Sequence, residues 1–194
     1  MQQSISRRAV QTIVREHQQL SAVINGMVRF VESLSDGAHA SAPMVMRAML
    51  YYIREYPEQV HHPKEDKYLF ARLQSRTDEL DDVIGTLQAQ HLEGEARVRD
   101  LEHALTRYEL GADAAAPALR SMVEDYAAFY SQHRRLEEEV ILPAALKCLS
   151  AADWMELDEA FGSNPDPFSG NEIQGELDRL YALVLNAVPA TAHP

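Results

Sequence analysis

Two histidines and a glutamate form the segment of this sequence that is best suited to chemistry, His-His-Pro-Lys-Glu at positions 61–65. His61 and Glu65 are four residues apart, so on a helix they lie on one face, one turn apart. His133 and Glu137 repeat this spacing. An imidazole nitrogen and a carboxylate oxygen placed in this way are suitable ligands for a metal ion. Both pairs therefore indicate metal binding on the faces of helices.

The elements that must position these pairs are long helices. Apolar residues recur at helical spacing through most of the chain, and His17 and His91 fall within two of the apolar stripes. Alternation with a period of two residues, which would indicate strands, is lacking. The predicted fold is all-α: an up-down-up-down four-helix bundle with two additional C-terminal helices. The expected helices span about 4–35, 43–76, 77–109 and 114–149, followed by 151–161 and 171–188.

We expect a single domain with two parts. Residues 1–150 form the bundle, and residues 151–194 form a C-terminal helical extension packed on it. Trp154 and Phe161 in the extension are large apolar side chains that require burial. The extension therefore covers one end of the bundle, although pairing of two chains through it is the alternative.

The predicted turns place the histidines at one level. In an antiparallel helix pair, residues equally distant from the turn lie at the same height. His17 and His61 are centred on residue 39, within the loop expected at 36–43. The midpoint between His91 and His133 is residue 112, within a Gly-Ala-Asp break. The midpoint between the 61–65 pair and His91 is residue 77, a predicted helix cap. The four helices therefore bring one histidine each to a common layer.

A single histidine on an apolar face is more often a hydrogen-bonded core residue than a ligand. Four histidines in register, two of them followed by glutamates, need a different explanation, because a carboxylate buried in a bundle is costly unless a cation compensates it. The predicted metal ligands are His17, His61, Glu65, His91, His133 and Glu137.

His62 is the ambiguous residue. It lies about 100° around an α-helix from its neighbour His61, so we expect it to point elsewhere. Pro63 is expected to kink the helix, and a rotation there would let His62 replace His61 as the ligand. Asp66 and Glu138 are expected to be solvated charges.

The ligand types narrow the choice of metal. Four imidazoles and two carboxylates are too many for one tetrahedral zinc ion and too rich in nitrogen for calcium or magnesium. The expected cofactor is a pair of iron ions with an oxo or hydroxo bridge, and manganese or zinc are the competitors. About two coordination positions then remain for a small ligand such as O₂, NO or peroxide.

Four segments together resemble the hemerythrin-like, HHE cation-binding family in its bacterial form. They are Arg-Glu-His-Gln-Gln-Leu around His17, the 61–70 segment, Gln-His-Leu-Glu-Gly around His91, and His-Arg-Arg-Leu-Glu from His133. The resemblance implies a four-helix bundle around a non-haem di-iron centre, with the six predicted residues as ligands. Oxygen-carrying hemerythrins use five histidines, two of them four residues apart on the third helix. Leu87 and Glu95 occupy that spacing from His91, so the resemblance is to four-histidine members, some of which handle nitric oxide or repair iron–sulfur clusters.

Two functions of different classes remain open. The first is a di-iron protein that binds O₂ or NO, or senses redox state or iron. The alternative is a di-iron enzyme that handles NO or peroxide, or an iron donor in cluster repair. Catalysis would need a proton donor, for which Tyr130 and Glu95 are the candidates.

Composition limits the partners. The net charge of −12 argues against nucleic acid and anionic membranes, both of which favour basic patches. The only cysteine, Cys148, excludes an intrachain disulfide and indicates a reducing cytoplasm. No run of about 18 apolar residues is present. We expect a cytoplasmic monomer or weak homodimer.

Overall fold

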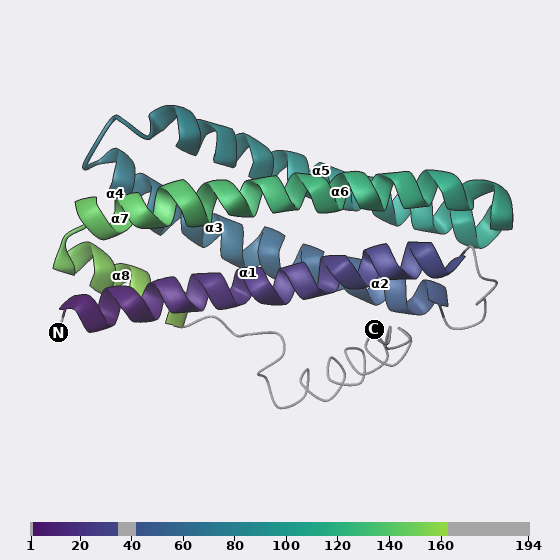
Figure 1. Ribbon diagram of the computed structural model, residues 1–194, viewed down its shortest axis with the longest axis horizontal. Helices are drawn as coiled ribbons and strands as arrows, with labels where there is room; N and C mark the ends of the chain where they lie inside the picture. The colour runs from purple at the N-terminus through teal and green to yellow at the C-terminus, as the bar shows by residue number, and fades with distance from the viewer. Residues whose placement is uncertain (1, 35–41, 163–194) are drawn as a thin grey trace, which may run out of the picture.

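The computed structural model describes residues 2–34 and 42–162, which are almost entirely helical and contain no strand. This confirms the all-α prediction. Figure 1 shows long helices lying side by side, with a short one across one end. The elements are α1 (Gln2–Ser33), α2 (Ala42–Ile53), η2 (Arg54–His61), α3 (His62–Lys64), η3 (Glu65–Phe70), α4 (Ala71–Gln74), α5 (Asp81–Gly111), η4 (Ala112–Ala115), α6 (Ala116–Leu136), η5 (Glu137–Ile141), α7 (Leu142–Cys148) and α8 (Ala151–Gly162).

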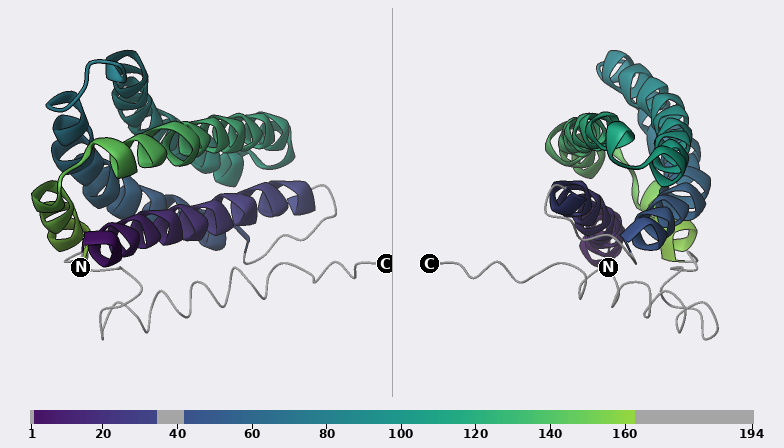
Figure 2. Two further views of the ribbon diagram at one scale, coloured as in Figure 1. Left: turned by 60° about the vertical axis from the view of Figure 1, so that its left-hand side comes forward. Right: turned by 90° about the vertical axis from the view of Figure 1, so that its right-hand side faces the viewer.

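The helices enclose two separate apolar clusters. Helix α1 packs against α2 and α6, and α5 packs against α2 and α6 from the other side (Figure 2). One cluster includes Met27, Leu50 and Leu105. The other includes Ile13 and Leu87 and continues into α8. On each long helix the predicted ligands fall between these two clusters, so the polar layer lies within an otherwise apolar interior.

Some predicted boundaries differ from the observed ones. The third helix begins at Asp81 rather than near residue 77, although Thr77 does accept a hydrogen bond from the backbone N–H of Glu79 (3.2 Å). Gly111 was expected to break this helix, but α5 includes it, and the 3₁₀ turn η4 makes the reversal. The helix expected at 171–188 lies outside the described residues.

The helical rod that carries His61 contains two π-helical segments, η2 and η3. Pro57 and Pro63 lack the N–H that an α-helical ladder requires, and the neighbouring turns widen. The backbone N–H of His62 accordingly donates to the carbonyl of Pro57, five residues back. A third π segment, η5, begins at Glu137 and precedes Pro143. Wide turns therefore occur on both helices that carry a His-x-x-x-Glu pair.

Helix α8 closes one end of the molecule. It packs against α1 and η3, and Trp154 and Phe161 are each only 1% exposed. Three ion pairs connect it to α1, to α4 and to the turn after α4: Arg8–Asp158, Arg72–Glu156 and Arg76–Asp153. The described part of the C-terminal extension thus packs on the bundle, while a boundary at residue 150 stays a prediction.

Candidate metal centre

All six predicted ligands are buried in one layer. None is more than 6% exposed, and the two glutamates are completely buried. They come from α1, the end of η2, the start of η3, α5, α6 and the start of η5 (His17, His61, Glu65, His91, His133 and Glu137). The structure therefore brings together every residue that the turn positions placed at one level.

The two carboxylates lie between the imidazole rings. Glu65 Oε1 is 3.1 Å from His61 Nε2 and 3.7 Å from His17 Nε2, while its Oε2 is 3.6 Å from His91 Nε2. Glu137 Oε2 is 3.1 Å from His17 Nε2 and 3.5 Å from His133 Nε2. Each carboxylate thus contacts rings from several helices, which is an arrangement suited to bridging two ions.

His62 also faces this layer, contrary to the expectation that it points elsewhere. It is 7% exposed, and its ring stacks on that of His91 with centroids 4.2 Å apart and planes 7° apart. Because wide π turns flank this point of the helix, both adjacent histidines reach the interior. Two sets of potential ligand atoms result, one from His62, Glu65, His91 and His133, the other from His17, His61 and Glu65.

Every ring in the layer has an oxygen partner at its Nδ1 atom. Each partner is a side chain that the sequence-based prediction did not assign to the site. The pairs are His17–Glu138 (3.1 Å), His61–Glu16 (2.7 Å), His62–Glu58 (3.3 Å), His91–Asp66 (3.2 Å) and His133–Gln90 (3.1 Å). Such partners fix the tautomer with the proton on Nδ1 and leave Nε2 to bind a metal. Asp66 and Glu138 are therefore not simply solvated charges.

The inner atoms of the layer lack conventional partners. Nε2 of His17, His61, His91 and His133 is fully buried without a hydrogen-bond partner among the described residues, and so are both oxygens of Glu65 and Glu137. Buried polar atoms of this kind are rare because they lose the solvation of water without replacement. Nitrogen and carboxylate donors that point at one another and lack partners fit a metal cluster.

The layer shifts the pKa values of its members in opposite directions. Burial, the largest influence, would lower the pKa values of His61 and His91, but nearby carboxylates raise that of His61 to about 9 and that of His91 to about 10. His133 is the exception, because burial lowers its pKa to about 4. Burial would raise the pKa of Glu137, and repulsion from Glu65 adds to this, yet the histidines lower it to about 2. Without metal, protons on His17, His61 and His91 therefore balance the carboxylates.

Other candidates lie outside the layer. The phenol of Tyr130 is buried and donates to the backbone carbonyl of His17 (3.3 Å). Glu95 and His103 are exposed on α5. His39 and His193 lie outside the described residues.

Comparison with known families agrees with this geometry. Residues 8–145 match the hemerythrin HHE cation binding domain. The chain belongs to this family. Membership in the hemerythrin family confirms the resemblance seen in the sequence, and it supports metal binding by the histidine and glutamate clusters.

Curated relatives extend the match beyond the family domain. Uncharacterised proteins of Mycobacterium tuberculosis and Mycobacterium bovis are 26% identical to this chain over 168 residues, which cover 82% of it. The match covers 62% of the length of these relatives. None of the described helices has the length and apolar character needed to cross a membrane.

Proposed function

We propose that this protein holds two iron ions and binds a small diatomic ligand, O₂ or NO, as a carrier, store or redox sensor. The proposed ligands are His17, His61, Glu65, His91 and His133, with His62 as a further histidine, and Glu137, whose buried oxygens lie beside His17 and His133. The observation that carries the proposal is the convergence of unpartnered Nε2 and carboxylate atoms on one buried layer. Iron bound there would supply reversible electron transfer to the ligand.

The number of available donors favours ligand binding. Two six-coordinate ions need about 12 bonds. The five histidines supply five, two bridging carboxylates supply four, and a shared oxo or hydroxo bridge would supply two. About one position would then be open to a small ligand; the group with His17 and His61 offers two rings, whereas the other offers three. A single open position suits one diatomic molecule.

Iron is the proposed metal because imidazole and carboxylate without thiolate suit it, with manganese or zinc as competitors.

The surroundings of the layer favour ligand binding over catalysis. The phenolic proton of Tyr130 is donated to the backbone carbonyl of His17, and Glu95 is exposed, which argues against either residue as a proton donor. A di-iron enzyme acting on NO or peroxide, or an iron donor for cluster repair, is the alternative.

We propose the same helix arrangement, domain bounds and oligomeric state that the sequence predicts. The helices would form an up-down-up-down four-helix bundle over residues 1–150, and residues 151–194, with two helices, would belong to the same domain. We propose a cytoplasmic monomer or weak homodimer without nucleic-acid partners, given the net charge of −12.

Metal analysis combined with visible spectroscopy tests the proposal. Two irons per chain are expected, and fewer than two, with zinc in their place, would refute both functions. Rapid mixing of the reduced protein with O₂ or NO then separates the two functions. An adduct that reverses on degassing supports binding, whereas repeated turnover with a reductant supports the enzyme. Glu65→Ala should lose iron, because its carboxylate contacts rings of both sets.

A further inference from the structure

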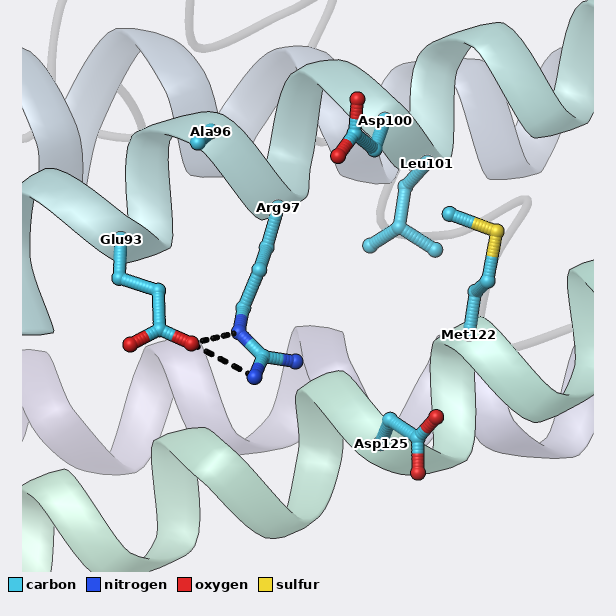
Figure 3. Close-up of a pocket in the computed structure, with 7 residues that line it drawn as sticks. All are labelled: Glu93, Ala96, Arg97, Asp100, Leu101, Met122 and Asp125. Carbon is cyan, nitrogen blue, oxygen red and sulfur yellow. Dashed lines mark hydrogen bonds and ion pairs between the residues drawn. The ribbon is translucent and has the colours of Figure 1, made fainter.

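A groove of about 350 Å³ lies between α5 and α6, outside the buried layer (Figure 3). Asp100 on α5 and Asp125 on α6 line it, and neither carboxylate has a hydrogen-bond or ion-pair partner among the described residues. Glu93 also lines the groove, and Arg97 is its only cation. Three carboxylates and one guanidinium give the groove a net negative charge, which attracts cations.

Arg97 on α5 also lines this groove. Its guanidinium donates to Glu93 (2.7 Å) and lies over the ring of Phe129, 4.6 Å from the ring centroid. The charge of Arg97 is therefore balanced within the groove by Glu93 and by its contact with an aromatic face. The two unpaired aspartates remain as the cation-attracting groups.

Gly94 lies three residues before Arg97 on α5 and is buried. A Cβ atom at this position would be 3.1 Å from Glu58 Oε1 and 3.7 Å from Phe129 Cε1. The absence of a side chain thus allows a buried carboxylate and the ring beneath Arg97 to approach the same point of the α5 backbone. A series of contacts therefore runs from Arg97 in the groove to Phe129, and from there to the Gly94 backbone and Glu58.

Glu58 is the buried carboxylate at the inner end. Its side chain is only 4% exposed, and Oε1, the atom nearest Gly94, has no hydrogen-bond partner among the described residues. Its other oxygen lies 3.3 Å from His62 Nδ1. Tyr126 marks the proximity of groove and carboxylate: burial chiefly raises its pKa, Glu58 raises it further, and Arg97 opposes them. Both charges therefore flank one phenol.

We propose that the groove and Glu58 form the route by which divalent iron reaches the buried layer. Asp100 and Asp125 attract the cation, Glu58 Oε1 binds it transiently beside Gly94, and His62 lies next on the path. Carboxylate oxygens suit a divalent iron or manganese ion that is still partly hydrated. This inference rests on the proposed function, because it requires a layer that takes up iron.

Orientation of His62 is the simpler role for Glu58, since Glu16 is placed similarly beside His61. The two roles predict different observables. Loss of an orienting group lowers the equilibrium affinity for metal. Loss of a route lowers the rate of uptake and leaves the final metal content unchanged. Substitutions in the groove, which do not touch any histidine of the layer, isolate the second effect.

The test measures how fast the metal-free, full-length protein takes up Fe²⁺ without oxygen. Samples are quenched with excess chelator at set times, and protein-bound iron is counted. The double variant Asp100→Asn/Asp125→Asn should load iron on the order of tenfold more slowly at low salt and reach the wild-type content. Glu79→Gln/Glu95→Gln, which removes the same charge from exposed positions elsewhere, should load at the wild-type rate. High salt should abolish the difference.

Gly94→Ala tests the inner step. Its Cβ should displace Glu58 Oε1 and slow uptake without lowering the final iron content. Iron uptake at the wild-type rate in the Asp100→Asn/Asp125→Asn variant would overturn the proposed route. Asp100 and Asp125 are exposed, so this variant still tests the route if Gly94→Ala fails to fold. Slowing of the charge-matched control to the same extent would overturn it too. A wild-type protein that takes up no iron refutes the proposed function instead.

Discussion

The substitution His62→Leu decides whether five or four histidines bind metal. His62 lies in the set with His91 and His133, and its ring stacks on that of His91. Leucine is apolar and similar in size, so it fills the space while removing the nitrogen donor. The ion in this set would then be left with two imidazoles, whereas the set of His17 and His61 keeps both of its own. The two ions should therefore respond differently.

The expected magnitudes follow from the contacts of His62. Loss of a hydrogen-bond partner outside the ligand set already weakens metal binding about 10–100-fold, so loss of a ligand should cost at least about 100-fold, or about 2.7 kcal/mol. The metal-free protein should also lose stability. The stacked pair contributes about 0.5–1.5 kcal/mol, and Glu58, left without its imidazole, costs about 1–3 kcal/mol.

The assay is iron content after dialysis against chelators of increasing strength. His62→Leu should release one iron at a chelator strength that leaves the wild type with two, and its visible spectrum should change accordingly. His103→Ala, which removes an exposed histidine from α5, should behave as wild type. Two irons held with wild-type affinity by His62→Leu would show that His62 is not a ligand and that the four-histidine set is correct.

Three further predictions concern the surroundings of the layer. Glu138→Gln should weaken metal binding about tenfold through its contact with His17, while the exposed Glu139→Gln should not; equal affinities by competitive chelator titration would contradict this. In the metal-free protein, the raised pKa values of His61 (about 9) and His91 (about 10) give stability that is fully present below pH 6.5 and lost as the pH rises through 9 to 10. Urea unfolding at pH 6.5, 8 and 10 measures this loss, and constant stability would refute it. Phe161→Ala should destabilise the protein by about 3–5 kcal/mol, measured by urea unfolding, because its ring is buried in the apolar cluster beneath α8; a loss below about 1 kcal/mol would show that α8 is not anchored by this residue.

Helical periodicity and turn positions were enough to predict which of the histidines meet. The level of His17, His61, His91 and His133 depends on where the chain reverses, so an error at a helix end matters little while the turn stays centred on the same residues. The third helix illustrates this tolerance. It begins at Asp81 instead of near residue 77, yet His91 still lies 5.0 Å from His133, measured between ring centroids. Register in long antiparallel helices is robust to such boundary errors.

Residues that depend on local rotation could not be predicted in this way. The position of His62 depends on the π turns around it, and α-helical spacing points it away from the layer. Four of the five Nδ1 partners come from neighbouring helices, so no spacing within one helix reveals them; Glu58, four residues before His62, is the exception. A signal was nevertheless present: Glu16, Asp66 and Glu138 each adjoin a predicted ligand in the sequence. A carboxylate beside one ligand can reach the outer edge of a histidine on the next helix.

The position of the layer between two apolar clusters determines how metal binding relates to folding. Each cluster packs residues from all the long helices, so the bundle holds the ligands in place from both sides. The layer itself contributes little packing, and without metal its buried carboxylates need protons on His17, His61 and His91 as counter-charges. Metal must displace those protons, so its affinity should rise with pH while the stability of the metal-free protein falls. The pH dependence of metal affinity and the pH dependence of stability therefore have the same cause. A histidine variant that loses only the pH dependence of stability would identify a residue that balances charge without binding metal.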